Sequence, residues 1–194
     1  FNEPIQGAKI NVRMQKHEFG FGSAVSSPMW FDESYDSQIY LQKLQNLTGD
    51  GRSFNIFAIE NALKWKAWED PYEQGKKEQV AQVAEWLADR DIRIRGHNLL
   101  WPNWEYMPTD MQENQNDPAY LATRIQSHIY EQARYNGIKG IINEWDVINE
   151  MGICHDLINA MNSDAIYADV LKWTAQSDAN AKLFLNENNI ISNG

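Results

Sequence analysis

The chain has 194 residues, 43% of them hydrophobic, which is enough for one domain with a real core. Its formal net charge of −10 disfavours nucleic acid and anionic membranes as partners. Its one cysteine, Cys154, excludes an internal disulfide. No stretch is apolar enough to span a bilayer, and the first residues show neither the basic start nor the apolar run of a signal peptide.

The N-terminal part of the chain predicts two strands and a helix. Residues 7–15 alternate between apolar and polar side chains, which indicates a half-exposed strand. We therefore divide the chain into an N-terminal β segment, residues 1–18, and a main domain, residues 19–194. Residues 19–25 are small and apolar and predict a buried strand, and residues 34–47 have the spacing of an amphipathic helix.

The rest of the chain alternates strictly between strand and helix patterns. The other predicted strands span residues 53–59, 92–97, 145–150 and 181–185. One predicted helix spans residues 76–90, a second opens at Asp117 and Pro118 and stops near Gly137, and a third begins at Ser163. This alternation predicts an α/β fold with a parallel sheet.

Polar side chains follow most of the predicted strands at the point where each strand ends. They are Glu60, Asn61, His97, Asn149, Glu150, Asn186 and Glu187. A doubly wound sheet concentrates its site at one switch point and shows a glycine-rich phosphate loop, which is absent here. Polar groups at many successive strand ends are what the site of a TIM barrel requires. The predicted fold is therefore a (β/α)8 barrel, of which this chain supplies about the first five strands.

The pair Asn149 and Glu150 is the strongest candidate for chemistry. The carboxyl group of Glu150 can give a proton, and the amide of Asn149 can hold a substrate hydroxyl. The alternative interpretation is a structural Glu that caps a helix or forms a salt bridge at a strand end. Asp146 and Glu144, earlier in the same strand, are predicted to be structural.

Four segments carry a family resemblance. IENALKW at residues 59–65, RGHNLLW at 95–101 and WDVINE at 145–150 resemble the E-N-x-x-K-W, R-G-H-x-L-x-W and W-D-V-x-N-E segments of the family 10 glycoside hydrolases. NENN at residues 186–189 stands where that family usually reads N-D-Y-N. The motifs come in the family's order and cover essentially the whole chain. The family consists chiefly of retaining endo-β-1,4-xylanases on a TIM barrel.

The resemblance implies a role for each matching residue. Glu150 is the general acid/base, and Asn149 holds the 2-hydroxyl of the sugar that is cleaved. Hydrogen bonds to this hydroxyl strengthen as the oxocarbenium-like transition state forms. The remaining substrate-binding residues that the resemblance implies are Glu60, Asn61, Lys64, Trp65, His97, Trp101 and Asn186.

Two departures from the family pattern matter. Pro102 and Asn103 follow Trp101 where the family commonly has histidine. The family's nucleophile, a Glu at the end of the seventh strand, has no match here, and a full barrel needs about 250 residues. We therefore expect the nucleophile outside this chain. Glu187 is an alternative second carboxylate, because neighbouring strands lie about 4.8 Å apart, although the family does not use its acidic residue at this place as the nucleophile.

The predicted activity is retaining hydrolysis of internal β-1,4-xylosidic bonds in xylan, outside the cell, because a polymer substrate cannot enter. We expect no cofactor and no metal, since His17, His128 and His155 show no ligand spacing. The expected partners are xylan or xylo-oligosaccharide and the C-terminal part of the barrel. The alternatives are a non-catalytic barrel fragment that binds xylan and a retaining glycanase for another sugar.

The tryptophans leave one question open. Trp86 and Trp173 stand on predicted helices and are expected to belong to the core. Trp30, Trp68 and Trp104 are expected either to stack on sugar rings or to pack against the protein.

Overall fold

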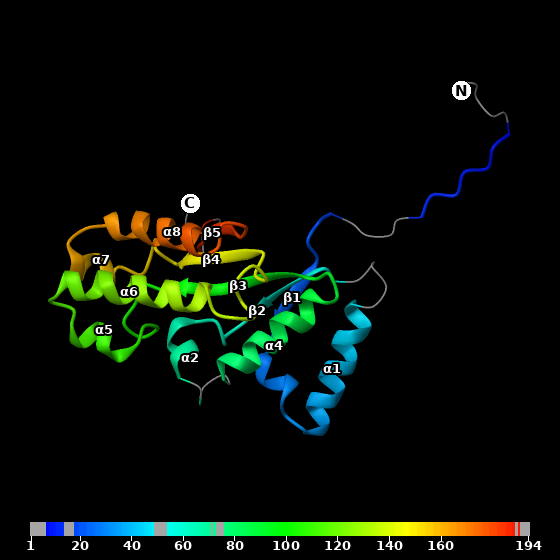
Figure 1. The fold of residues 1–194 in the computed structure, drawn as a ribbon, viewed down its shortest axis with the longest axis horizontal. Coiled ribbons are helices and arrows are strands. Elements are labelled where there is room, and N and C mark those ends of the chain that lie inside the picture. The colour runs from blue at the N-terminus through cyan, green and yellow to red at the C-terminus, as the bar shows by residue number, and fades with distance from the viewer. Residues whose placement is uncertain are drawn as a thin grey trace.

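The computed structural model describes residues 7–13, 18–48, 54–70, 72, 76–188 and 190. Its strands form one sheet in the order β1-β2-β3-β4-β5, and all neighbours in the sheet are parallel (Figure 1). The strands are β1 (Gly22–Val25), β2 (Ile56–Ile59), β3 (Arg93–Leu100), β4 (Glu144–Asn149) and β5 (Lys182–Asn186). The helices are η1 (Ser27–Trp30), α1 (Tyr35–Thr48), α2 (Trp65–Glu69), α4 (Lys77–Ala88), α5 (Thr109–Glu113), α6 (Pro118–Ala133), α7 (Asp156–Met161) and α8 (Ala165–Ser177).

The strand order gives the winding of the fold. Each strand lies beside the one that precedes it in the chain, so the connections never reverse direction across the sheet. Because parallel crossovers are right-handed, such an order places the connecting helices on one face of the sheet. A doubly wound sheet would reverse its order at a switch point. The structure therefore confirms the predicted α/β fold, with the winding of a TIM barrel.

The two long central helices bury the faces that their sequence patterns predict. Asp117 caps α6, because its Oδ1 accepts hydrogen bonds from the backbone N–H groups of Ala119 and Tyr120 at 3.1 and 3.0 Å. Gly137, at the predicted stop after α6, adopts a φ of +85°, which glycine tolerates best. The buried residues of the two stripes are Val80, Val83, Ala84 and Leu87 on α4, and Leu121, Ile125, Ile129 and Ala133 on α6.

Strand β4, between β3 and β5, is the most deeply buried strand, since all of its residues are buried. Trp145 on β4 is fully covered and lies opposite Gly96 of β3 in the sheet register. A Cβ atom at Gly96 would overlap the Trp145 ring. The glycine of the RGH segment is therefore required by the neighbouring tryptophan.

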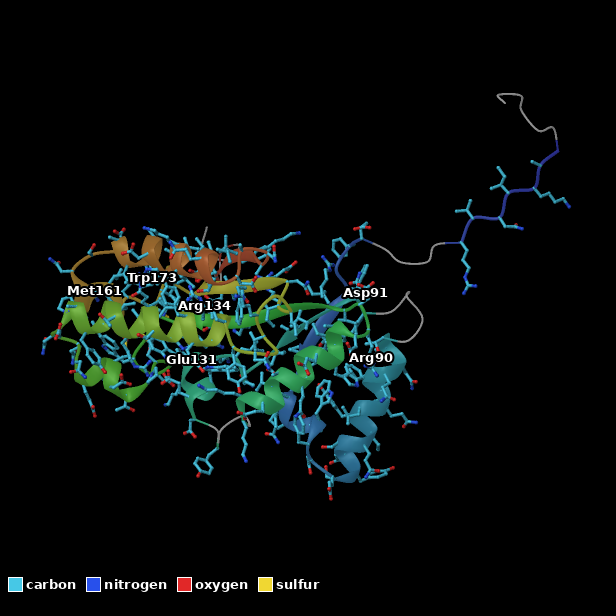
Figure 2. The ribbon with its side chains drawn as sticks, viewed as in Figure 1. Arg90, Asp91, Glu131, Arg134, Met161 and Trp173 are labelled. Carbon is cyan, nitrogen blue, oxygen red and sulfur yellow. The ribbon has the colours of Figure 1, made fainter. Side chains whose placement is uncertain are left out.

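Glu131 lies on α6 (Figure 2). It connects α6 with α2 and α4. Its carboxylate accepts a hydrogen bond from Trp68 Nε1 of α2 at 2.6 Å and forms an ion pair with Lys77 Nζ of α4 at 2.8 Å. Trp68 is buried, which places it in the core and not among candidate sugar platforms. Trp30 is half-buried and packs edge-on against the ring of Trp86 at 5.6 Å between centroids, so it also serves packing.

The N-terminal predictions are wrong in two respects. The first barrel strand is shorter than residues 19–25, and only Val25 of β1 is buried, because β1 is the edge of the sheet. Residues 7–13 are exposed and form no strand, since they have no neighbour to pair with among the described residues. Residues 14–15 and 53 of the predicted strands lie outside the described residues.

Three short helices, α2, α5 and α7, were not predicted, because elements of five or six residues show too few turns for a periodic pattern. Across the described part of the chain, no helix is long and apolar enough to cross a membrane.

Candidate active site

The carboxyl ends of β2 to β5 meet at one edge of the sheet, because the strands are parallel and adjacent. The sequence places a predicted site residue at or just after the end of each of these strands. In a barrel this edge carries the active site. The fold thus brings the predicted groups to the same end of the molecule.

Asn149 and Asn186 form a direct pair at this edge. A register shift between Asp146 and Ile148 sets Asn149 opposite Asn186 in the sheet. Asn186 Nδ2 donates a hydrogen bond to Asn149 Oδ1 at 2.7 Å. Asn149 is buried, and its own Nδ2 group remains unpaired among the described residues. The pair thus holds one amide with a donor left for a substrate hydroxyl, as the predicted role of Asn149 requires.

Glu150 leaves the strand in an uncommon backbone conformation. Its φ is +55°, a left-handed value that residues other than glycine rarely adopt. The conformation is fixed on both sides: Glu150 N–H donates to the Asn186 carbonyl at 2.7 Å, and its own carbonyl accepts from Cys154 N–H at 2.9 Å. Backbone strain of this kind clusters at functional sites. The motif did not reveal this feature.

Glu150 is half-buried, and its carboxyl group has one hydrogen-bond partner within the described residues. Asn188 Nδ2 donates a hydrogen bond to Glu150 Oε1 at 2.7 Å. Asn188 stands where the family commonly has tyrosine, and the sequence motifs predicted no role for it. Its position directly after the Asn186–Glu187 pair was the available signal.

Both carboxylate oxygens of Glu187 accept hydrogen bonds from the backbone. Its Oε2 accepts a hydrogen bond from Gly152 N–H at 2.7 Å, and its Oε1 accepts one from Asn188 N–H at 3.1 Å. A Cβ at Gly152 would come within 2.9 Å of Glu187 Oε2. Glu187 therefore anchors the turn that follows Glu150, and both of its oxygens are occupied.

His97 is held by a buried ionic network. Asp146 accepts from His97 Nδ1 at 2.9 Å through one oxygen and from Arg95 Nη2 at 2.6 Å through the other. Burial alone would raise the pKa of Asp146, but the bonds from His97 and Arg95 outweigh it and hold that pKa below its usual value. The network fixes the imidazole with Nδ1 toward Asp146, which leaves Nε2 for a ligand. Asp146 therefore has the structural role that was expected: it orients the imidazole of His97.

A second group of predicted residues gathers around Trp101. Lys64 Nζ donates to Asn61 Oδ1 at 2.8 Å and lies 5.3 Å from the centre of the Trp101 ring. Trp101 in turn stacks on Tyr106 at 3.7 Å between ring centres. Tyr106 was absent from the predicted site. An ammonium, an amide and a half-buried indole in one place are a good set for binding sugar hydroxyls and a pyranose face.

The other two predicted residues make none of these contacts. Glu60 directly follows β2, is exposed, and its carboxylate makes no hydrogen bond or ion pair within the described residues. Trp65 is buried, stacks on His128 at 4.2 Å and donates through Nε1 to Glu69 at 2.8 Å. Trp65 thus packs in the core at the start of α2, where its side chain is not accessible to a substrate.

No group of three or more His, Cys, Asp or Glu side chains is placed to hold a metal ion anywhere in the described ranges. The chemistry available here is that of a half-buried carboxyl group among amides, next to a cationic and aromatic binding surface. This arrangement can protonate a leaving oxygen while it holds hydroxyl groups.

Comparison with known proteins gives several relatives, including an anti-sigma factor and a xylanase. Anti-sigma-I factor RsgI6 of Acetivibrio thermocellus is 26% identical over 187 residues, which cover 96% of this chain and 22% of that protein. An endo-1,4-beta-xylanase of Agaricus bisporus is 25% identical over 183 residues, which cover 90% of this chain and 50% of that protein. The chain therefore spans half or less of the length of these relatives.

The fold is shared with solved structures. The crystal structure of xylanase 10B from Thermotoga petrophila in complex with xylobiose superimposes with a TM-score of 0.67, at 21% identity, and the match covers 91% of this chain and 53% of that one. The family model of Glycosyl hydrolase family 10 matches residues 11–194. These matches confirm the resemblance read from the four motifs, and the chain belongs to glycosyl hydrolase family 10.

Proposed function

We propose that this chain is part of a retaining endo-β-1,4-xylanase domain in which Glu150 is the general acid/base. The observation that carries the proposal is the placement of Glu150 at the end of β4, bonded to Asn188 and followed by a turn anchored by Glu187, in a chain of family 10. A general acid in this position protonates the glycosidic oxygen as the bond to the sugar breaks.

The substrate-binding roles follow from the two groups at the sheet edge. Asn149 donates to the 2-hydroxyl of the sugar that is cleaved, and its pairing with Asn186 fixes its orientation. His97 lines the same subsite, oriented by Asp146. Asn61 and Lys64 bind hydroxyl groups on the non-reducing side, with Glu60 beside them and Trp101 as the aromatic surface.

Retention requires a second carboxylate about 5 Å from the first, which acts as the nucleophile. Glu187 is the only other carboxylate bonded into the turn after Glu150 within the described residues, and its oxygens bind backbone N–H groups. We therefore assign the nucleophile to a part of the protein outside these 194 residues. That part is the C-terminal half of the barrel, which pairs with the open edges of β1 and β5. The protein works outside the cell, because xylan is a polymer.

A second candidate function is favoured by one observation. One relative is an anti-sigma factor, and its alignment covers 96% of this chain at 26% identity. The same fold and surface then bind xylan or its oligosaccharides as a sensing module without cleaving them. The two functions differ in one measurement: a sensing module is retarded by soluble xylan in a native gel but releases no reducing ends from it.

Sugar choice tests the proposal. The protein that carries this chain is expected to release reducing ends from xylan much faster than from carboxymethyl cellulose, because a narrow fit excludes the hydroxymethyl group of glucose. Reducing-sugar release from both polymers at equal mass concentration provides the measurement. Equal rates would assign the domain to a different glycanase, and no release with retained binding would assign it to the sensing function.

A further inference from the structure

A hollow lies at the same end of the sheet as Glu150. Its volume is about 340 Å³, which is within the range of small-molecule sites. It contains none of the residues of the proposed cleavage site. Its lining consists of Trp104, Gln115, Asn116, Asp156, Asn159 and Ala160.

Three segments that follow strand ends build this hollow. Trp104 lies in the segment after β3, Gln115 and Asn116 lie between α5 and α6, and Asp156 opens α7 after β4. Figure 1 shows α5 and α7 together at the end of the molecule toward which β3 points. Two of these segments are fixed to each other, since Trp104 N–H donates to Asp156 Oδ2 at 3.0 Å. The hollow is therefore a built feature and not a gap between independent loops.

The polar groups around the hollow have hydrogen-bonding capacity to spare. The side-chain amides of Gln115, Asn116 and Asn159 are exposed and make no hydrogen bond within the described part of the chain. Each amide offers donors and an acceptor at once, which matches the donor and acceptor character of a hydroxyl group. Asp156 uses one oxygen for Trp104 N–H and keeps the other for a ligand.

Trp104 supplies the apolar surface of the hollow. Its side chain is half-buried and packs partly on the core. Its ring has no aromatic or cationic partner among the described residues, in contrast to Trp101, which stacks on Tyr106. A flat indole face beside amide groups is suited to the apolar face and the equatorial hydroxyls of a pyranose.

The lining excludes other classes of ligand. It contains a carboxylate and no lysine or arginine, so an anion such as a phosphate or a nucleic acid would be repelled. One carboxylate among neutral amides supplies too little negative charge to hold a cation tightly. The mainly polar lining disfavours a lipid chain. A neutral, polyhydroxylated ligand remains.

We propose that this hollow is an accessory saccharide-binding site that takes one or two xylose units of the polymer without cleaving them. The proposal rests on the proposed function for the identity of the sugar. Its consequence is that the protein holds polymeric xylan at a point apart from the cleavage site, which raises the affinity for long chains and leaves short substrates unaffected.

The test compares a polymer with a short substrate in the protein that carries this chain. Trp104→Ala is expected to raise KM for soluble xylan several-fold at unchanged kcat, and to leave kcat/KM for an aryl xylobioside unchanged. In a Glu150→Gln background, the same change is expected to weaken retardation in native gels that contain xylan by about tenfold, the loss of one good stacking contact. Asn116→Ala is expected to give a smaller effect in the same direction.

Tyr130→Ala serves as the matched control, because Tyr130 is a half-buried aromatic on α6 that does not line the hollow. It should leave both substrates and the gel retardation unchanged. If the parent protein cleaves xylan while Trp104→Ala and Asn116→Ala bind and cleave it as the parent does, the accessory site is refuted and the proposed function stands. If the parent neither cleaves nor binds xylan, the proposed function fails and this inference fails with it.

Discussion

At the scale of the residue, the account depends on the carboxyl group of Glu150. A general acid matters most when the leaving group is poor. We expect Glu150→Ala to reduce cleavage of xylan by about 100- to 10,000-fold, while an aryl xyloside with a good leaving group still transfers its sugar to the enzyme. Azide is expected to restore the later step, since it needs no general base. Rates on the two substrates, with and without azide, provide the measurement.

Asn188→Ala serves as the comparison for that experiment, because it removes the donor to Glu150 Oε1 and leaves the carboxyl group in place. It should lower the rate on xylan far less than Glu150→Ala does. A uniform loss on both substrates in Glu150→Ala, without rescue by azide, would mean that Glu150 is nucleophilic or structural.

A second residue-scale prediction concerns His128, which is buried beneath Trp65. Burial lowers the pKa of His128 to about 3, and its Nε2 donates to the Leu99 carbonyl at 3.0 Å. The unfolded histidine titrates near 6.5, so between about pH 6.5 and pH 3 the unfolded chain binds one more proton. The free energy of unfolding should therefore fall as the pH falls through this window.

The NMR signal of the His128 ring provides the measurement. Its chemical shift should stay constant from pH 8 to about pH 4, because burial lowers the pKa of His128 to about 3. His128→Phe identifies the signal and should flatten the dependence of unfolding on pH between 4 and 6.5. A midpoint near 6.5 for His128 would show that the ring is accessible to water.

At the scale of the element, the pairing of β3 with β4 depends on Gly96. A Cβ at this position would overlap the Trp145 ring, so Gly96→Ala should lower the free energy of unfolding by about 3 kcal/mol. In a Trp145→Leu background the smaller side chain leaves room, and the added cost of Gly96→Ala should shrink below about 1 kcal/mol. Urea unfolding of the four variants measures this coupling. Additive costs would contradict the steric explanation.

The elements also show how far the sequence predicts the fold. Long helices with a regular apolar stripe, α4 and α6, were predicted closely because burial of one face determines them. Apolar runs predicted β2 and β4 for the same reason. The sequence could not predict the exposure of β1, because burial of a strand depends on its neighbours in the sheet and not on its own side chains. The short helix α7 depends on tertiary bonds such as the one from Trp104 N–H to Asp156.

The sequence likewise predicted some features of the candidate site and not others. Chain position alone predicted that Asn149 and Glu150 lie at the end of β4. It did not predict that His97 lies inside β3 or that Lys64 directly precedes α2. The motifs did not show that Trp65 is buried beneath the site, since stacking on His128 involves residues 63 positions apart. Nor did they show the left-handed backbone of Glu150, which is held by a long-range hydrogen bond to the Asn186 carbonyl and a local one from Cys154 N–H.

At the scale of the whole molecule, the sheet is open at both edges. No strand pairs with the outer side of β1 or β5 within the described residues. Open edges of this kind invite association with another strand. The winding of a barrel and the shorter length of this chain relative to its relatives together support a second half that closes it. This half is where we place the nucleophile.

Release of reducing sugar from xylan, measured with the purified 194-residue chain and with the longer protein that contains it, tests this assignment most directly. Because retention needs two carboxylates that act as a unit, the account predicts turnover by the longer protein and none by the chain alone. Adding the following segment as a separate fragment should restore turnover, and Glu187→Gln in the longer protein should remain active. Turnover of xylan by the chain alone, abolished by Glu187→Gln, would contradict the account and make Glu187 the nucleophile.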